Sequence, residues 1–222
     1  MTKKILKPRK SGYTFADYFK LNLETEEVVA FFDYSFEAAH CRLPQTKVAA
    51  ARLADLRGRI DESLPFINLS NEVARREFLI SPVLLEVVSQ THAKISVEYP
   101  LEVELNLKGT LDYFLRADNR LLVIEAKNAD LQRGFTQLAV ELIALDKWIT
   151  DKSRTLYGAI SIGDVWRFGV LDRRKKLITQ DLKLYPVPDA LEGLLGILIA
   201  ILKHPDRAGQ AGSSNRSNGR KK

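Results

Sequence analysis

The sequence has little cysteine or histidine, and this scarcity excludes several classes of protein. Its single cysteine, Cys41, cannot form an internal disulfide framework or a cysteine-rich zinc site. The three histidines, His40, His92 and His204, are scattered and do not supply a zinc-binding pattern in its place. Nothing in the chain resembles a P-loop or a dinucleotide-binding fingerprint. The cysteine usage is typical of a protein of the reducing cytoplasm.

Long hydrophobic runs are also missing. The longest, Leu191–Leu202, is shorter than the roughly 20 residues that cross a bilayer. We expect a buried helix here, with a dimer contact as the alternative. The segment Met1–Lys10 is basic but lacks the apolar stretch of a secretory signal. The sequence therefore predicts a cytoplasmic protein without a membrane association.

Positive charge is concentrated at the two ends of the chain. The net charge is +6, but residues 1–10 and 204–222 each carry five Lys or Arg, leaving 24 basic and 27 acidic residues between them. Flexible basic ends can add non-specific affinity for phosphate groups, and they can equally serve only to keep the protein soluble. The net charge therefore does not identify a nucleic-acid-binding surface on the body.

The length of 222 residues, 45% of them hydrophobic, fits one α/β domain with attached tails. The stretch that follows Arg207 is rich in Gly, Ser and Asn and is expected to be disordered. We predict four segments: a basic tail (1–12), an extension of strand and helix (13–69), a nuclease-like core (70–203) and a disordered basic tail (204–222).

Hydrophobic periodicity predicts a mixed sheet covered by helices. An aromatic and β-branched segment, 28–43, favours a strand or hairpin, and helices are expected at 45–60, at about 70–88 with Pro82 dividing it, at 131–149 and at 189–203. The 131–149 helix has the clearest apolar stripe. Strand-like runs separated by turn residues such as Pro100 and Gly109 are predicted at 95–99, 103–107, 110–115, 121–126, 156–162, 165–171 and 177–184.

Charged residues interrupt two of these apolar strands. Strand alternation places Glu125 and Lys127 on one face, while the opposite face is formed by Leu122, Ile124 and Ala126. One strand earlier, Asp112 lies in a run that otherwise looks buried. Buried charges are normally paired or bound to metal because isolating them from water is costly. If the two strands form a hairpin, Asp112 and Glu125 can converge on one oxygen-rich site that suits magnesium.

The acid-x-Lys spacing alone is weak evidence, because it occurs twice. It is found at Glu125–Lys127 and again at Asp181–Lys183. Only the first follows an apolar strand, has Asp112 on a neighbouring strand and precedes a long amphipathic helix. The context therefore favours the first copy, although a salt-bridged surface cluster remains the alternative for its three charged residues.

These residues resemble the PD-(D/E)xK nuclease superfamily, over roughly residues 71–171. Beyond the three charged residues, Asn71–Arg76 followed by Leu79–Leu84 is similar to the first helix of the nuclease domain in type I restriction enzyme subunits. Tyr157–Ile160 with Gly163–Phe168 is similar to the later strand pair of those domains. Leu111 replaces the proline that gives the superfamily its name, which is a common departure. The resemblance implies a restriction-endonuclease-like mixed β-sheet flanked by helices.

The resemblance also implies a metal site and roles for individual residues. Asp112 and Glu125 would bind Mg²⁺, which Mn²⁺ can replace, with the Ala126 carbonyl and an early acidic residue, Glu72, as further ligands. Lys127 would orient the attacking water or stabilise developing negative charge. Gln137, on the following helix, would be an accessory contact. For Glu72 helix capping is an equal explanation, and for Gln137 an ordinary surface position is the alternative.

The leading hypothesis from the sequence is a Mg²⁺-dependent nuclease that hydrolyses phosphodiester bonds in DNA, in restriction, repair or mobile-element processing. The preference for DNA over RNA comes from the resemblance. A different class remains open, namely a catalytically inactive nucleic-acid-binding or assembly module of the same fold, and so does another metal-dependent phosphoryl chemistry. A homodimer, or a restriction or repair partner protein, is also left open.

Overall fold

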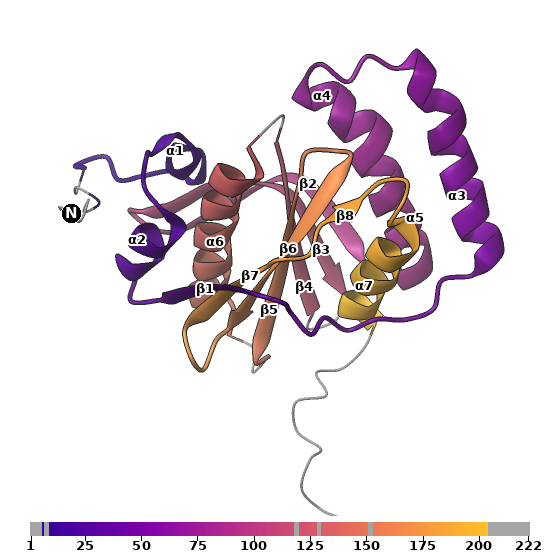
Figure 1. The fold of residues 1–222 in the computed structure, drawn as a ribbon. Coiled ribbons are helices and arrows are strands. Elements are labelled where there is room, and N and C mark those ends of the chain that lie inside the picture. Colours follow the sequence, from indigo (N-terminus) through magenta and orange to yellow (C-terminus); the bar gives the residue numbers. More distant parts are fainter. Residues whose placement is uncertain (1–5, 7–8, 118–119, 128–129, 151–152, 204–222) are drawn as a thin grey trace, which may run out of the picture.

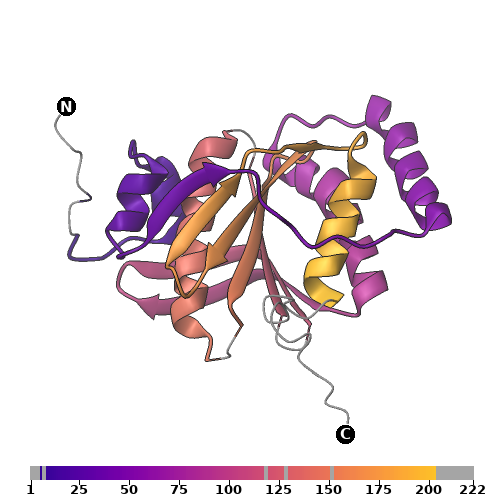
Figure 2. The ribbon, with the colours of Figure 1, turned by 60° about the horizontal axis from the view of Figure 1, so that its bottom comes forward.

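The computed structural model describes residues 6, 9–117, 120–127, 130–150 and 153–203, and these form three layers. An eight-stranded mixed sheet lies in the middle, with helices on both faces (Figures 1 and 2). The prediction of an α/β fold with a mixed sheet flanked by helices is therefore confirmed. The two basic tails fall largely or wholly outside the described residues.

The strands follow the order β1-β7-β6-β5-β4-β3-β2, with β8 paired to β6. Two neighbouring pairs, β1 with β7 and β4 with β5, are parallel, and the other pairs are antiparallel. The strand β1 comes from the predicted extension and completes one edge of the sheet. The bounds are β1 Ser35–Ala39, β2 Lys94–Glu104, β3 Leu107–Ala117, β4 Arg120–Ala126, β5 Thr155–Ser161, β6 Val165–Asp172, β7 Leu177–Asp181 and β8 Tyr185–Pro186.

One face of the sheet is covered by α1 (Phe15–Lys20), α2 (Thr25–Ala30) and α6 (Leu131–Trp148). The apolar stripe predicted for α6 is buried here, with Phe135 and Leu138 fully inaccessible to solvent. The two short helices pack against α6 from its outer side (Figure 1). As a result, α6 is enclosed between the sheet and the N-terminal helices, so polar groups on its inner side have little access to water.

The opposite face is covered by a second group of helices (Figure 1). The final helix α7 is buried along most of its length, which confirms the prediction of a buried helix for the apolar run. Among the described residues, the helices are too short or too polar to cross a membrane. The elements of this face are α3 Ala50–Ser63, the 3-10 turn η1 Leu64–Phe66, α4 Glu72–Arg75, the π-helical turn η2 Arg76–Ile80, α5 Ser81–Thr91 and α7 Leu191–Lys203.

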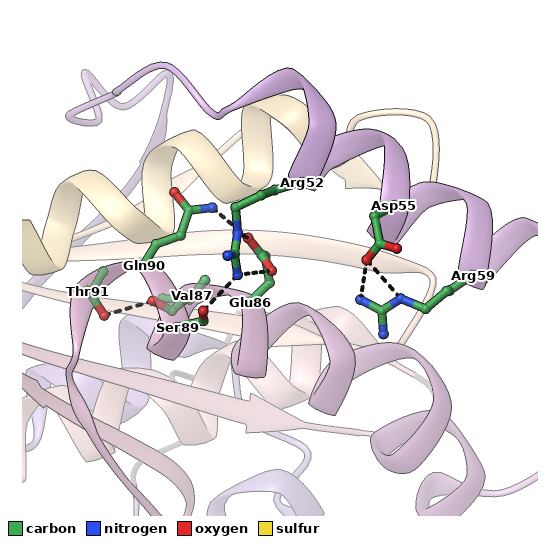
Figure 3. A network of polar contacts seen from close by, with 8 residues as sticks. All are labelled: Arg52, Asp55, Arg59, Glu86, Val87, Ser89, Gln90 and Thr91. Carbon is green, nitrogen blue, oxygen red and sulfur yellow. Dashed lines mark hydrogen bonds and ion pairs between the residues drawn. The ribbon is translucent and has the colours of Figure 1, made fainter.

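A charged network fastens α3 to α5 (Figure 3). The guanidinium of Arg52 donates to both carboxylate oxygens of Glu86, at 2.6 and 2.9 Å, and Gln90 donates a further hydrogen bond to Glu86 at 2.7 Å. The hydrogen bonds from Arg52 are the main reason why the pKa of Glu86 is held below its ordinary value. Further along the same side of α3, Arg59 and Asp55 form an exposed ion pair. This network orients the outermost helix of the layer.

The segment 28–43 differs from its prediction as a strand or hairpin. Val28 and Val29 belong to helix α2 and are fully buried, and only the stretch from Ser35 is a strand. The hydroxyl of Thr25 lies 2.8 Å from that of Thr136 on α6, which ties α2 to its neighbour. Packing against α6 therefore overrides the β-propensity of the two valines.

The segment 70–88 is helical, but it is not one regular helix. Its predicted start is confirmed, because the side chain of Asn71 accepts a hydrogen bond from the amide of Ala74 at 2.8 Å. The π-helical turn η2 follows, and π-turns often accompany functional sites. Pro82 lies in the first turn of α5, a position where proline does not disturb the hydrogen bonds of the helix.

The predicted strands 95–99 and 103–107 are not separate: residues up to Glu104 belong to one strand, β2, and Leu107 begins β3. Pro100 stays inside β2 because β2 is an edge strand, where a missing amide donor is tolerated. Gly109, predicted as a separator between strands, lies inside β3 instead. A Cβ atom at Gly109 would lie 2.9 Å from the ring of Phe15, so this glycine lets α1 approach the sheet.

Glycines also set the distance between α6 and the sheet. Gly158 and Gly169 are cross-strand partners, and a Cβ at Gly158 would lie 2.7 Å from Leu138. In the first turn of α6, a Cβ at Gly134 would lie 2.0 Å from Ile160 Cδ1 and 3.1 Å from Lys127 Cγ. Bare backbone at these positions brings the start of α6 against the end of β4.

We predict that Gly134→Ala destabilises the protein by about 1–3 kcal/mol, because overpacking outweighs the gain in helix propensity. Gly58→Ala is the matched control, since a Cβ at Gly58, within α3, meets no atom within 4 Å. This control should stabilise by about 1 kcal/mol. Urea denaturation of both variants measures the difference. Equal stabilisation by the two substitutions would contradict the close packing of α6.

Candidate active site

The predicted site lies where β3 and β4 stop pairing. The register of the two antiparallel strands runs as far as Tyr113 opposite Ile124. Beyond this pair, a side chain replaces the backbone carbonyl as hydrogen-bond acceptor. The Asp112 carboxylate accepts a hydrogen bond from the Ala126 amide at 2.8 Å. Asp112 therefore fixes the end of β4 and lies beside the segment that carries Glu125 and Lys127.

The same end of β4 is joined to β5. The two strands are parallel, and the Lys127 amide donates to the Ser161 carbonyl at 2.8 Å. Ligands in α/β proteins commonly bind beyond the carboxyl ends of parallel strands. The predicted residues thus lie at a position where the architecture favours a site.

Glu125 is fully buried on the side of the sheet that faces α6. Its Oε1 atom pairs with the Lys127 ammonium and accepts a hydrogen bond from the Gln137 amide at 2.7 Å. The predicted alternation of β4 is confirmed, because Val123 packs in the α6 cluster and its neighbour Ile124 in the opposite cluster. Gln137 is also buried, so its alternative interpretation as an ordinary surface residue is wrong.

Glu141 belongs to the same buried cluster, and it was not among the residues predicted from the sequence. It is fully buried on α6, and its Oε1 atom accepts a hydrogen bond from Gln137 Nε2 at 2.9 Å. Gln137 therefore bridges two buried carboxylates, those of Glu125 and Glu141. The signal was present in the sequence, because residues four apart share a helix face and Glu141 interrupts an otherwise apolar run.

Three oxygen atoms in this cluster have no hydrogen-bond partner within the described structure. They are Glu125 Oε2, Gln137 Oε1 and Glu141 Oε2, and all three are inaccessible to solvent. Each is an acceptor that a proton, a donor or a cation would satisfy. Buried acceptors are rarely left unsatisfied in proteins, so these oxygens need protons, including one shared between the Glu125 and Glu141 carboxyl groups, or a bound cation.

Burial and mutual repulsion disturb the ionisation of the carboxyl groups. Burial, followed by the charges of Glu141 and Asp112, raises the pKa of Glu125 well above its ordinary value. Burial also raises the pKa of Glu141 to about 7. Perturbed carboxyl groups of this kind are typical of functional sites, since a cluster optimised for stability would avoid the repulsion.

Lys127 is the cation inside this cluster. Burial acts to lower its pKa, but the carboxylates of Glu125 and Asp112 outweigh burial and raise the pKa. The ammonium also lies 5.4 Å from the ring centre of Phe19 on α1. Its side chain remains 14% exposed. Lys127 is therefore charged, held from two sides and still reachable from solvent.

Glu72 is half-buried as the first residue of α4. Among the described residues, no hydrogen bond or ion pair joins it to the carboxylate cluster. Arg76, four residues further along the chain, donates a hydrogen bond to the hydroxyl of Tyr113, the residue after Asp112, at 3.3 Å. The structure thus gives no contact that would single out Glu72 as a ligand, and its role stays a prediction.

The described residues contain no group of three or more His, Cys, Asp or Glu side chains arranged to hold a metal ion. Two of the carboxylate oxygens are already bound by other groups. Asp112 Oδ2 is bound by the Ala126 amide, and Glu125 Oε1 is bound by Lys127 and Gln137. Three other oxygens of the cluster, Glu125 Oε2, Glu141 Oε2 and Gln137 Oε1, nevertheless have no hydrogen-bond partner among the described residues. Carboxylate and amide oxygens are the ligands that a hard cation such as Mg²⁺ prefers.

The second acid-x-Lys copy has a different environment. Asp181 is buried at the end of β7, and its Oδ1 atom accepts hydrogen bonds from the amides of Cys41 and Lys183, at 3.2 and 3.1 Å. Asp181 therefore organises the backbone around it. This difference supports the choice of Glu125–Lys127 as the candidate site.

No protein-family model, curated protein or solved structure gives a match to this chain. The geometry and electrostatics of the site therefore carry the proposed function, and membership of the PD-(D/E)xK superfamily is a proposal.

We predict that the metal-free protein loses stability as the pH rises from about 4.5 to about 7. Glu141 has a raised pKa when folded and releases its proton near 4.5 when unfolded, so the folded state binds more protons within this window. The raised pKa of Glu125 acts in the same direction. Urea denaturation in EDTA at pH 5, 6, 7 and 8 measures the effect.

Glu141→Gln should flatten this pH dependence and be more stable than the parent at pH 8. Asp181→Asn, which replaces a buried carboxylate outside the cluster, is the control and should still lose stability as the pH rises, because Glu125 and Glu141 are intact. A parent protein whose stability stays constant or increases between pH 5 and 8 would contradict the account of the buried carboxyl groups.

Proposed function

We propose that this protein is a Mg²⁺-dependent nuclease that hydrolyses phosphodiester bonds, with a site of the PD-(D/E)xK type. The observation that carries the proposal is the grouping of Asp112, Glu125 and Lys127 where β3 and β4 separate, with unpartnered buried oxygens beside them. A cluster that served only to pair charges would leave fewer acceptors unsatisfied.

In this proposal Asp112 and Glu125 hold the metal, helped by Glu141 and the Ala126 carbonyl. When bound, Mg²⁺ would supply Lewis-acid stabilisation of charge on the phosphate and make the attacking water more acidic. Gln137 orients the carboxylates of Glu125 and Glu141, because its amide binds both. Glu72 stays a further candidate ligand.

Lys127 has the role of an electrostatic stabiliser. Its ammonium is charged and partly exposed, and the backbone that carries it is fixed to β5. A cation held in advance at this position costs little reorganisation when negative charge develops on the phosphate or the attacking oxygen. Its ion pair with Glu125 keeps it aimed at the metal side of the site.

DNA as the substrate and partner, and the cytoplasm as the location, follow from the resemblance and from the cysteine usage of the sequence. The body of the protein carries more acidic than basic residues. Contacts with the nucleic acid therefore depend on local groups of positive charge and on the basic tails.

The test is incubation of the purified protein with plasmid and with single-stranded DNA, in Mg²⁺, in Mn²⁺ and in EDTA. We expect cleavage with either metal and none in EDTA. Asp112→Asn and Glu125→Gln keep the shapes of the side chains and should abolish activity. Lys127→Met should lower the rate about 100- to 1,000-fold, as expected for loss of a charge-stabilising group.

Asp181→Asn is the matched control, because it changes the acid of the second acid-x-Lys copy, and it should cleave like the parent. Metal-independent cleavage, or full activity in the Asp112 and Lys127 variants, would rule the proposal out. Metal-dependent DNA binding without any cleavage would favour the inactive binding module instead.

A further inference from the structure

Arg76 lies at the edge of the candidate site, at the start of the π-helical turn η2. Its guanidinium lies 5.1 Å from the ring centre of Tyr113, and its Nε atom donates to the Tyr113 hydroxyl at 3.3 Å. Tyr113 directly follows Asp112 on β3 and packs in the apolar cluster on the face of the sheet opposite α6, so Arg76 approaches the Asp112 end of the site from that face. The side chain of Arg76 is 17% exposed. Arg76 is therefore held rigidly beside the site and can still be reached from solvent.

The charge of Asp112 reaches Arg76. Burial acts to lower the pKa of Arg76, but Tyr113, Glu98 and Asp112 outweigh it and raise the pKa. The other cation at the site, Lys127, is engaged by Glu125. A phosphate group bound at the proposed metal would bring further negative charge to these carboxylates, and a second cation near Asp112 can bind that phosphate.

The neighbouring Arg75 does not fit this role, although it has the same charge. Its Nη1 atom donates to the Ile162 carbonyl at 2.7 Å and pairs with Asp164 at 3.2 Å. These contacts fasten α4 to the turn between β5 and β6. The two adjacent arginines therefore differ, since Arg75 joins two parts of the fold and Arg76 contacts Tyr113 and Glu98, next to Asp112 and opposite it on the neighbouring strand.

The remaining partner of Arg76 is Glu98. The Nη1 atom of Arg76 donates to Glu98 Oε1 at 2.7 Å, and the Glu98 side chain is 54% exposed. Glu98 has a positive φ of 53° and interrupts the pairing of β2 with β3 opposite Asp112. An ion pair with such an exposed partner contributes little stability, so another anion can replace the carboxylate.

We propose that Arg76 binds a phosphate of the nucleic-acid substrate close to the scissile bond, and that Glu98 occupies the guanidinium until the substrate replaces it. This inference rests on the proposed nuclease function and adds a substrate-binding residue to it. A guanidinium matches two phosphate oxygens with two parallel N–H donors, which an ammonium cannot do.

Steady-state cleavage of a labelled DNA duplex in Mg²⁺ by the full chain tests the inference. Arg76→Gln should raise KM at least about tenfold, as expected for loss of a charged hydrogen bond, with a smaller change in kcat. The KM of Arg76→Lys should lie between those of the parent and Arg76→Gln. Arg59→Gln removes an equal charge from an exposed ion pair on α3 and should match the parent.

Two further measurements separate phosphate binding from a structural effect. Glu98→Gln removes the competing carboxylate and should lower KM. A series of duplexes, each with one phosphate near the cleavage point replaced by a neutral methylphosphonate, should contain one that is cleaved poorly by the parent. The Arg76→Gln variant should be insensitive to that same replacement, because it has already lost the contact.

The two proposals fail in different ways. A folded parent protein that cleaves no DNA in Mg²⁺ or Mn²⁺ overturns the nuclease function, and the inference with it. A parent that cleaves, together with an Arg76→Gln variant whose KM equals that of Arg59→Gln, overturns the inference alone. If Arg76→Gln does not fold, Arg76→Lys and Glu98→Gln decide, and an unchanged KM in both overturns it.

Discussion

Burial of the Glu125 carboxylate is the constraint on which the candidate site depends. Transfer of an isolated carboxylate from water into a protein interior costs several kcal/mol, so it needs compensation. Lys127 and Gln137 supply part of it by binding Oε1. Among the described residues no N–H or O–H group is placed to donate to the other oxygen, Glu125 Oε2, or to Glu141 Oε2. The fold therefore maintains a group of buried acids that either protons or a cation must neutralise.

The surrounding architecture keeps this group dry and in place. Helix α6 approaches the sheet closely because Gly134, Gly158 and Gly169 lack side chains, and this brings Gln137 and Glu141 onto the end of β4. The short N-terminal helices then cover the outer side of α6. Extensive apolar burial on both faces of the sheet offsets the cost of the buried carboxyl groups, which is a common trade between stability and function.

The grouping of Asp112 with Glu125 and Lys127 could be predicted from the sequence, and the contacts around these residues could not. Glu125 could be found because a charge within an apolar strand is a local signal that alternation makes interpretable. Glu141 is likewise a charged residue within an apolar run, but the apolar stripe of α6 drew attention to the hydrophobic positions instead. Arg76, by contrast, owes its place to contacts between helix and sheet, which no spacing reveals. The same holds for the fold, since the helical state of Val28 depends on packing against α6, and the place of Pro100 depends on which strand forms the edge.

Direct measurement of Mn²⁺ binding tests the central claim that the buried carboxylates form a cation site. Electron paramagnetic resonance can count free Mn²⁺ during titration of the parent protein, Glu125→Gln, Glu141→Gln and the control Asp181→Asn at pH 7.5. We predict saturable binding by the parent and the control, loss of that binding in Glu125→Gln and weaker binding in Glu141→Gln. Equal binding by all four proteins, or no saturable binding by the parent, would contradict the account.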